Sequence, residues 1–396
     1  MKLDRSLVVF PFLFVLLFFF SCPNKGQHGK QSHDTKNETA FVKITPPKDG
    51  IIGDSTDLTF PTNEDFWRGI FVKGRVVKLT PFYMARHEVS YKLWKEVYDW
   101  AIKNDYKFKN AGKKGGALEE QYKEEQHTDM EPVTSISWMD CIVWCNAYTE
   151  KKDGNDKNCV YQSSGDTLKD ATNTELYGYL DAEFEKTGFR LPTEAEWEFC
   201  ARYQGNDSTN AVKLGEAYYT RLDSASGANK PVGFKKLKYE GASAENKTLW
   251  DAVKDEASRV AVYRWFFNGE DFGGDDFDVD KKTGHEFPSE KAYSKFSPDV
   301  SGTREIGSKA PNSLGLFDMS GNVTEFVYDE YRTPPLSPVE ETDPDAASST
   351  SPYDGLQVVK GASWAHHSLY LGVGYRTGVK TFDNAGEQTG FRLVHR

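Results

Sequence analysis

The sequence is poor in cysteine, in aliphatic residues and in positive charge. Five of its 396 residues are cysteine, too few for the disulfide-dense class of small secreted scaffolds. Beyond residue 20 no apolar run approaches the ~20 residues that a membrane-spanning helix needs. Lysine and arginine total 49 against 60 aspartates and glutamates, a formal net charge of −11. Because nucleic acid is a polyanion, we expect no nucleic-acid partner.

The sequence is rich in aromatic residues, although it is poor in aliphatic ones. The aromatic residues make up 14% of the chain, while all hydrophobic residues together reach only 38%. We therefore expect a core of tryptophan, tyrosine and phenylalanine packed among many polar connections. The sequence contains no tandem repeat. The composition predicts an irregular, loop-rich globular domain.

The N-terminus has the layout of an export signal. Lys2 and Arg5 precede an apolar run over residues 7–20, which is followed by Ser21 and Cys22. The run is too short to span a bilayer comfortably, so residues 1–21 are predicted to be a signal peptide. A small residue before a cysteine resembles a bacterial lipoprotein signal, which would make Cys22 the lipidated first residue. Plain secretion is the alternative, because Phe19 replaces the usual leucine.

A polar segment follows Cys22 and is almost free of aliphatic residues until Phe41. Such a segment buries too little surface to fold by itself. We expect residues 22–59 to be a flexible tether and the folded domain to cover 60–396. The protein is then a membrane-anchored lipoprotein of the outer membrane or cell surface.

Three helices have recognisable starts. Ser90 and Ser137 each precede apolar residues at helical spacing, and Thr193 forms a capping box with Glu196. The apolar face of each helix is predicted to belong to the core. Strands are predicted at 69–77, 81–86, 357–364 and 390–394. Segments rich in Gly, Asp, Lys and Ser are predicted to be surface insertions on one domain: 104–130, 150–187, 203–250 and 268–305.

The four cysteines after Cys22 are Cys141, Cys145, Cys159 and Cys200. The first two lie four residues apart, on one face of a predicted helix, and the last falls in another helical pattern. Free thiols in the core are favoured for this arrangement. Two disulfides are the alternative in an exported protein.

Five motifs occur in the order of one enzyme family. They are Met84-Ala-Arg-His-Glu-Val-Ser, Pro132-Val-Thr-Ser-Ile-Ser-Trp, Phe189-Arg-Leu-Pro-Thr-Glu-Ala-Glu-Trp-Glu-Phe, Pro311-Asn through Gly321-Asn-Val-Thr-Glu-Phe, and Gly361-Ala-Ser-Trp with Gly390-Phe-Arg. Together they resemble the formylglycine-generating enzyme, or sulfatase-modifying-factor, family. The resemblance implies an α+β, C-type-lectin-like fold that is loop-rich and forms a single domain.

The catalytic thiols of that family are missing. The family uses two cysteines, five and ten residues past the first glycine of its Gly-Gly-Ser segment, to hold copper. Counted from Gly361, these positions are His366 and Leu371. Copper(I) requires soft thiolate ligands, so no formylglycine-forming activity, no catalytic residue and no catalytic cofactor are expected.

Metal binding is predicted at one turn. The resemblance implies a structural calcium ion held by the carbonyls of Ser320, Gly321 and Val323 and by the side chain of Glu325, which are hard oxygen ligands. An empty turn with Glu325 bonded to backbone amides is the alternative. Neighbouring His366 and His367 would point to opposite faces of a strand, which disfavours a shared metal.

The segment 361–392 carries a second, narrower resemblance. Its frame, Gly-Ala-Ser-Trp, then Gly-Val-Gly-Tyr-Arg, then Gly-Phe-Arg-Leu-Val, is similar to the variable regions of proteins that retroelements diversify. This implies outward-facing, exchangeable side chains on a fixed backbone, as in antibody loops. The implied ligand-binding residues are Ala365, His366, His367, Leu369, Tyr370, Tyr375, Asp383 and Asn384. An ordinary C-terminus of a degenerate enzyme relative is the alternative.

These features together predict a monomeric, surface-displayed lipoprotein that binds a protein or glycan outside the cell through residues 361–392. Two other classes remain open, an enzyme of different chemistry and a structural lipoprotein on the same scaffold.

Overall fold

A computed structural model describes residues 40–53, 64–117, 123–232, 244–264, 277–279, 286–288, 302–332, 339–344 and 355–396. Residues Lys36–Arg396 form one compact unit. The predicted signal peptide, Cys22 and the first part of the predicted tether lie outside the described residues. Within the described part of the chain, no helix is both long and apolar enough to cross a membrane.

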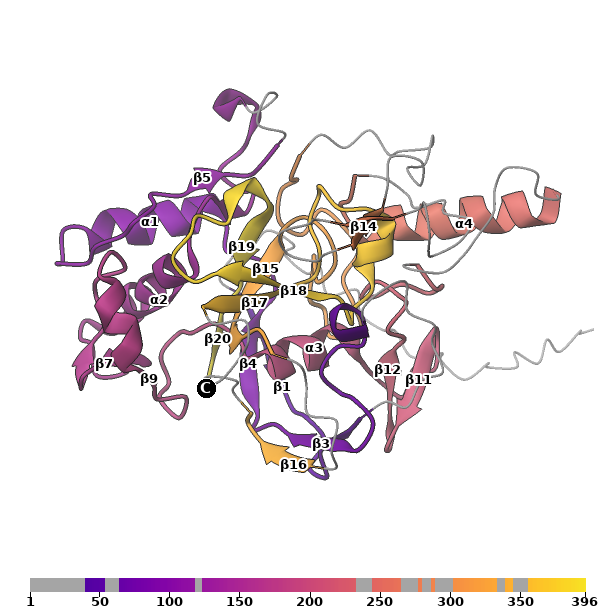
Figure 1. The fold of residues 1–396 in the computed structure, drawn as a ribbon, viewed down its shortest axis with the longest axis horizontal. Coiled ribbons are helices and arrows are strands. Elements are labelled where there is room, and N and C mark those ends of the chain that lie inside the picture. Colours follow the sequence, from indigo (N-terminus) through magenta and orange to yellow (C-terminus); the bar gives the residue numbers. More distant parts are fainter. Residues whose placement is uncertain are drawn as a thin grey trace, which may run out of the picture. The chain divides into compact units, whose positions relative to one another are not determined.

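A four-stranded sheet organises the domain (Figure 1). Its strands run in the order β18 (Arg376–Lys380), β17 (Leu356–Lys360), β15 (Thr324–Glu330) and β19 (Thr389–Phe391). β15 pairs with β19 in parallel and with β17 in antiparallel orientation. The last residues of the chain therefore pair with a strand formed some 65 residues earlier, since Thr324 lies opposite Thr389.

The predicted tether is wrong for residues 40–53. β1 (Phe41–Ile44) pairs antiparallel with β4 (Phe82–Ala85), whose other edge holds β20 (Val394–His395). β2 (Ile51–Ile52) pairs with β3 (Arg75–Lys78), which also holds β16 (Val339–Thr342). Ile44 and Ile51 are buried. These apolar side chains come after the polar run and pack in the core. The segment is polar on average, so its composition does not reveal them.

The three predicted helix starts are confirmed. α1 (Tyr91–Ala101), α2 (Trp138–Asp153) and α3 (Glu194–Arg202) begin after Ser90, Ser137 and Thr193, whose side chains accept hydrogen bonds from the first turn. α2 and α3 have complete capping boxes, closed by Asp140 and Glu196. These local hydrogen bonds satisfy amides that a helix leaves unpaired.

The predicted insertions contain more regular structure than expected. α4 (Ala244–Val260) lies partly in one of them, and its Val253, Ala257 and Val260 are buried. Short sheets occupy others: β5 (Lys113–Lys114) with β6 (Val133–Thr134), β7 (Tyr161–Ser163) with β8 (Asp166–Thr167) and β9 (Leu180–Ala182), β10 (Tyr203–Gly205) with β12 (Ala217–Thr220) and β11 (Ala211–Leu214), and β13 (Phe277–Val279) with β14 (Glu286–Pro288). The 3-10 turns in the described ranges are η1 (Glu64–Phe66), η2 (Glu124–Gln126), η3 (Thr174–Tyr179), η6 (Ser368–Leu371) and η7 (Gly386–Gln388).

The core is aromatic, as predicted from composition. The rings of Trp94 and Trp144 stack with centroids 5.7 Å apart, and Phe391 meets both edge-on. The predicted free thiols are confirmed, since all four cysteines of the described domain are buried and unpaired with one another.

Candidate functional site

The predicted variable segment folds back on itself. It leaves β17, passes through η6 and β18, and returns through η7 to β19. The indole Nε1 of Trp364 donates a hydrogen bond of 2.8 Å to the carbonyl of Glu387, which joins the beginning of the segment to its end. Trp364 is buried, with 1% of its surface exposed. A fixed tryptophan thus holds the two halves together, as the predicted frame requires.

Four of the predicted ligand-binding side chains are buried, so the expectation that they face solvent is wrong. These are His367, Leu369, Tyr370 and Tyr375. Tyr370 stacks on Trp67 with ring centroids 5.2 Å apart, and Tyr375 lies 5.3 Å from the same indole and 5.0 Å from Tyr370. They share a core cluster with residues of α4 and of segment 225–232. Segment 225–232 belongs to the predicted insertion 203–250, which was expected on the surface, whereas the α4 residues of the cluster lie just beyond that insertion.

His366 is partly exposed, but its ring is held by its own loop. Its Nδ1 accepts a hydrogen bond from the backbone amide of Ser363 (3.1 Å) and lies 2.7 Å from that residue's hydroxyl. Burial lowers the pKa of His366 to about 4. Burial and the neighbouring His366 and Arg264 lower the pKa of His367 to about 3. Both imidazoles are therefore neutral at physiological pH.

Asp383 and Asn384 are exposed, as predicted. The Asn384 amide donates to the carbonyl of Ser135 (3.0 Å) and to the side chain of Asn110 (3.2 Å). Its oxygen accepts from the backbone of Gly386 (2.8 Å), which closes a side-chain turn typical of asparagine. The loop before β19 is therefore anchored on the domain, while the Asp383 side chain projects beyond it.

A cavity of about 420 Å³ opens beside this loop. Its lining residues come from β5, from the turn before α2 and from both ends of the variable segment: Lys113, Ala117, Ser135, Trp364, Asn384, Gly386, Glu387 and Gln388. The Glu387 carboxylate lies 3.0 Å from Lys113 Nζ and accepts from the amide of Ala117 at 3.4 Å. The lining residues include one tryptophan, a carboxylate, two side-chain amides and an ammonium, groups that can bind a polar ligand.

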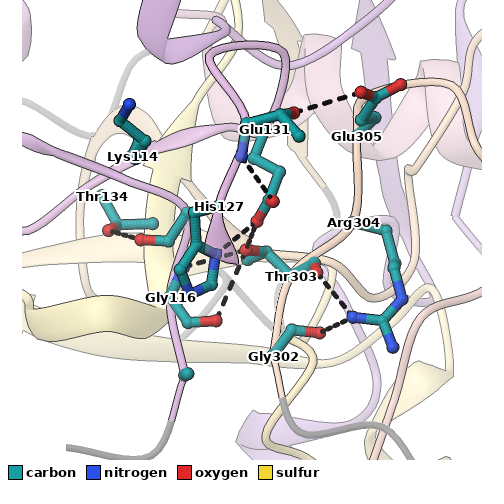
Figure 2. Close-up of polar contacts among 12 residues, drawn as sticks. Lys114, Gly116, His127, Glu131, Thr134, Gly302, Thr303, Arg304 and Glu305 are labelled. Carbon is teal, nitrogen blue, oxygen red and sulfur yellow. Dashed lines mark hydrogen bonds and ion pairs between the residues drawn. The ribbon is translucent and has the colours of Figure 1, made fainter. Parts of the chain in front are cut away.

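One wall of this cavity rests on a buried polar cluster (Figure 2). The amide of Gly116 donates to the hydroxyl of Thr303 (2.8 Å), and that hydroxyl donates to Glu131. Glu131 also bonds His127 Nδ1 at 2.8 Å. Gly115 has a φ of +60°, and any Cβ there would collide with Glu131, Thr303 and His127. The segment behind Lys113 and Ala117 is thus fixed before any ligand arrives. No sequence motif points to this wall, because Gly116 and His127 lie in one predicted insertion and Thr303 in another.

Glu325, the predicted calcium ligand, is fully buried and bound by other side chains. Its Oε2 accepts from Arg392 Nε (2.6 Å) and Trp197 Nε1 (2.7 Å), and its Oε1 accepts from Arg392 Nη2. Ser320 donates its hydroxyl to the Leu371 carbonyl, and the Gly321 amide donates to Gly361. In the described residues no group of three or more His, Cys, Asp or Glu side chains could hold a metal. The calcium site stays a prediction, and the contacts give Glu325 a structural role.

Two further acids surround this ion pair. Glu88 accepts hydrogen bonds from the Asn322 side chain (2.7 Å) and the Val323 amide (3.2 Å). Burial, with the nearby carboxylates of Asp318 and Glu325, raises its pKa well above the ordinary value. Burial also raises the pKa of Asp318 to about 6, although the hydrogen bond from Gly307 opposes the rise. Three acids thus share one arginine in a site without solvent.

The remaining thiols offer no substitute for the missing copper ligands. Burial raises the pKa of Cys141, Cys145 and Cys200 well above the ordinary value, and that of Cys159 to about 12. All four are therefore protonated at neutral pH, and a thiol binds copper well only as thiolate. Leu371, at the second predicted copper position, is fully buried in apolar surroundings.

The aromatic core, the short sheets and the ordered motifs define a loop-rich α+β protein with a C-type-lectin-like fold of the sulfatase-modifying-factor type. A family model described as the sulfatase-modifying factor enzyme 1-like domain matches residues 62–396. The chain belongs to this family.

Individual relatives are distant. The chaperone protein LppX of Paenibacillus barcinonensis is 21% identical over 318 residues, which cover 80% of this chain and 81% of that protein. Among solved structures, variable protein 1 of Treponema denticola superposes with a TM-score of 0.52 at 21% identity, covering 90% of this chain and 94% of that one. PvdO from Pseudomonas aeruginosa gives 0.46 at 17% identity, with 90% and 94% covered. At these identities the structural likeness shows the fold alone.

Proposed function

We propose that the chain is a surface-displayed binding protein that takes a protein or glycan ligand in the cavity between Trp364 and the loop before β19. The observation that carries the proposal is the combination of an anchored backbone with exposed side chains at that loop. Trp364 and Asn384 bind it to the domain, while Asp383 is free to change. A rigid support with variable side chains is the arrangement that binding loops need.

We also propose that a retroelement exchanges side chains of this segment, at fewer positions than the eight that the sequence implied. Of the eight implied residues, Ala365, His366, Asp383 and Asn384 reach the surface. Asn384 also anchors the loop, and the His366 ring lies 5.2 Å from the Tyr370 ring. Exchange that spares both the anchor and the aromatic cluster is therefore proposed for Ala365 and Asp383. A near-copy of the 3′ end of the gene, adenine-rich at these codons and next to a reverse-transcriptase gene, is the genomic finding expected. If the genome has no such near-copy, diversification is contradicted, but the proposed binding role is not.

A role without formylglycine chemistry is supported by the protonated thiols and by the residues at the two copper positions. The names of the Paenibacillus and Treponema relatives, a chaperone and a variable protein, state no reaction. We further propose that Cys22 carries a lipid, that the polar residues after it lead to the domain, and that the protein acts as a monomer at the outer membrane or cell surface.

The test is a binding screen of the full chain on arrays of glycans and of extracellular proteins, followed by substitution in the loop. Asp383 and Gln388 are changed together to serine, and Asp181→Ser on exposed β9 is the matched control. We expect the loop variant to lose at least about 10-fold in affinity, or about 1.4 kcal/mol, with the control unchanged. Equal binding by both variants would refute the proposed site, and so would the absence of any ligand from both arrays.

A further inference from the structure

The sheet at which the described domain begins has an outward aromatic side. β1, β4 and β20 form one three-stranded antiparallel sheet (Figure 1). One side of this sheet packs in the core, where Ile44, Phe82 and Met84 are buried. Side chains alternate along a strand, so Lys43 and Tyr83 belong to the opposite, outward side.

Four rings gather on this outward side. Tyr83 stacks on His395 with ring centroids 4.9 Å apart and an angle of 4° between the planes. Phe41 and Phe189 lie 4.8 and 5.4 Å from the same imidazole, both at 73°. Tyr83 is 36% exposed, the other three rings are half-buried, and Lys43, which lies opposite Tyr83, is exposed. We call these five residues, Phe41, Lys43, Tyr83, Phe189 and His395, the entry face.

The entry face is also the place from which the chain leads back to its N-terminus. Phe41 is the first residue of β1 and lies 19 positions after Cys22. A chain spans at most about 3.5 Å per residue, so Phe41 stays within about 65 Å of Cys22. A lipid on Cys22 therefore holds this sheet near the bilayer. Such linkage raises the effective concentration of the domain at the membrane, so a weak surface contact is sufficient.

We propose that the entry face rests on the interface of the bilayer, an inference that depends on the proposed lipid at Cys22. Tyrosine suits this place because its ring is apolar while its hydroxyl reaches water, and tyrosine is enriched where membrane meets water. The stem of Lys43 can lie along apolar surface while its ammonium reaches the lipid head groups. Because the chain from the lipid joins the domain at this face, a bilayer is favoured over a second protein as the partner.

Contact at the entry face leaves the ligand cavity open. Gln388 lines the cavity beside Trp364, and His395 follows Gln388 seven positions later, through β19 and β20. At about 3.3 Å per strand residue, this path measures up to about 23 Å. The entry face and the cavity lie at opposite ends of the path, so the domain can contact lipid at one end and a ligand at the other.

The test uses the full lipidated chain in vesicles of phosphatidylethanolamine and phosphatidylglycerol. Lys43→Cys carries a fluorescent label, and Ile102→Cys, at a residue that ends α1 and is 49% exposed, is the matched control. The native cysteines of the described domain are buried, so they are shielded from the label. Spin-labelled lipids quench a fluorophore that touches the bilayer. We expect at least about 2-fold quenching at position 43 and less than about 1.2-fold at position 102.

Variants of Tyr83 in the labelled Lys43→Cys chain separate the aromatic contact from the tether. Tyr83→Ser keeps the lipid but loses the ring, so quenching should fall by about half or more. Tyr83→Phe keeps the ring and should retain the quenching of the parent. Circular dichroism identifies any loss that comes from unfolding, and comparison of Tyr83→Phe with the parent provides the test should Tyr83→Ser not fold.

Failure of this inference and failure of the lipid anchor give different results. A chain that does not float with the vesicles has no anchor, which overturns the proposed location together with the entry face. A chain that floats but is quenched equally at positions 43 and 102, or at neither, keeps the anchor and overturns the entry face alone. Unchanged quenching in Tyr83→Ser would also overturn it, since the tether alone would then account for the contact.

Discussion

Asp318 is a buried acid whose charge burial disfavours, and its replacement should stabilise the protein. The side chain is 2% exposed, near the buried Glu325 and Glu88, and accepts a hydrogen bond from the Gly307 amide at 2.6 Å. Its backbone has a φ of +55°, a left-handed conformation that asparagine tolerates better than most residues. Asp318→Asn keeps an oxygen for Gly307 and removes the charge.

The size of the effect follows from linkage between protonation and folding. Burial raises the pKa of Asp318 from 3.8 to about 6. Above pH 6 the Asp318 carboxylate is ionised in the folded protein, where its charge is less favourable than in the unfolded chain. The free energy of unfolding therefore falls as pH rises between about 4 and about 6. The loss is about 3 kcal/mol at pH 7.5, because each pH unit of difference corresponds to about 1.4 kcal/mol, and it falls to about 1 kcal/mol at pH 4.5. A weaker hydrogen bond to Gly307 offsets about 1 kcal/mol.

The assay is urea unfolding of both proteins at pH 7.5 and 4.5, followed by tryptophan fluorescence. We expect Asp318→Asn to be more stable than the parent by about 2 kcal/mol at pH 7.5, and the difference to shrink by about 2 kcal/mol at pH 4.5. Asp181→Asn, on exposed β9, should show no pH-dependent difference. A variant that is less stable at pH 7.5, or equally affected at both pH values, would refute the reasoning about buried charge.

Four other predictions follow from the site and the sequence. Cys22→Ala should abolish labelling of the protein by a palmitate analogue in cells, and a label that persists would exclude this cysteine as the anchor. A sulfatase peptide should show no cysteine-to-formylglycine conversion by mass spectrometry, with or without copper, because the described thiols are protonated. The predicted calcium site and its alternative, an empty turn, differ in one measurement: because Arg392 already binds Glu325, we expect EDTA to leave the melting temperature unchanged, and a fall with EDTA or a rise on adding calcium would support the calcium site instead. Tyr375→Ser should cost about 3–5 kcal/mol and Asp383→Ser less than about 0.5, and equal costs in thermal unfolding would contradict their different burial.

Local sequence signals predicted the helix starts and some of the strands. Ser90, Ser137 and Thr193 act through hydrogen bonds within three residues, so the sequence alone contains the partners. The strand at 81–86 and the C-terminal strands likewise follow from short alternating patterns. The family motifs then supplied the fold, which these local patterns could not determine.

Burial of the C-terminal segment could not be predicted in this way. Tyr370 and Tyr375 are polar-aromatic residues of the kind that occur in binding loops, and they become core only because Trp67 and α4 cover them. α4 itself has few apolar residues, so its pattern resembles a polar insertion until Val253, Ala257 and Val260 are seen to lie on one face. Contacts between distant segments decide both cases.

The cavity beside Trp364 could not be predicted for the same reason, although one of its lining residues was expected to bind a ligand. Asn384 was among the implied binding residues, but Lys113 and Ala117 lie some 270 residues earlier. The wall that carries them depends on Glu131. Its carboxylate bonds the nearby His127 and also Thr303, which lies 172 positions from Glu131 in the sequence. A residue with such partners has no local pattern by which it could be recognised.

Buried ion pairs hold the central sheet without help from the exposed loop before β19. Arg376 binds Glu194 through two hydrogen bonds of 2.7 Å, Lys360 lies 3.1 Å from Glu198, and Arg392 binds Glu325. Despite burial, Arg376 and Lys360 lower the pKa of Glu194, so this pair stays ionised. Breaking such a pair typically costs about 3–5 kcal/mol, because the remaining charge has no solvent. Two of the pairs join a strand of the central sheet to α3, and the third joins β15 to Arg392, just after β19, so none of them involves a side chain of the loop before β19. The stability of the frame and the chemistry of the loop can therefore change independently, which is the condition that a diversified binding surface must meet.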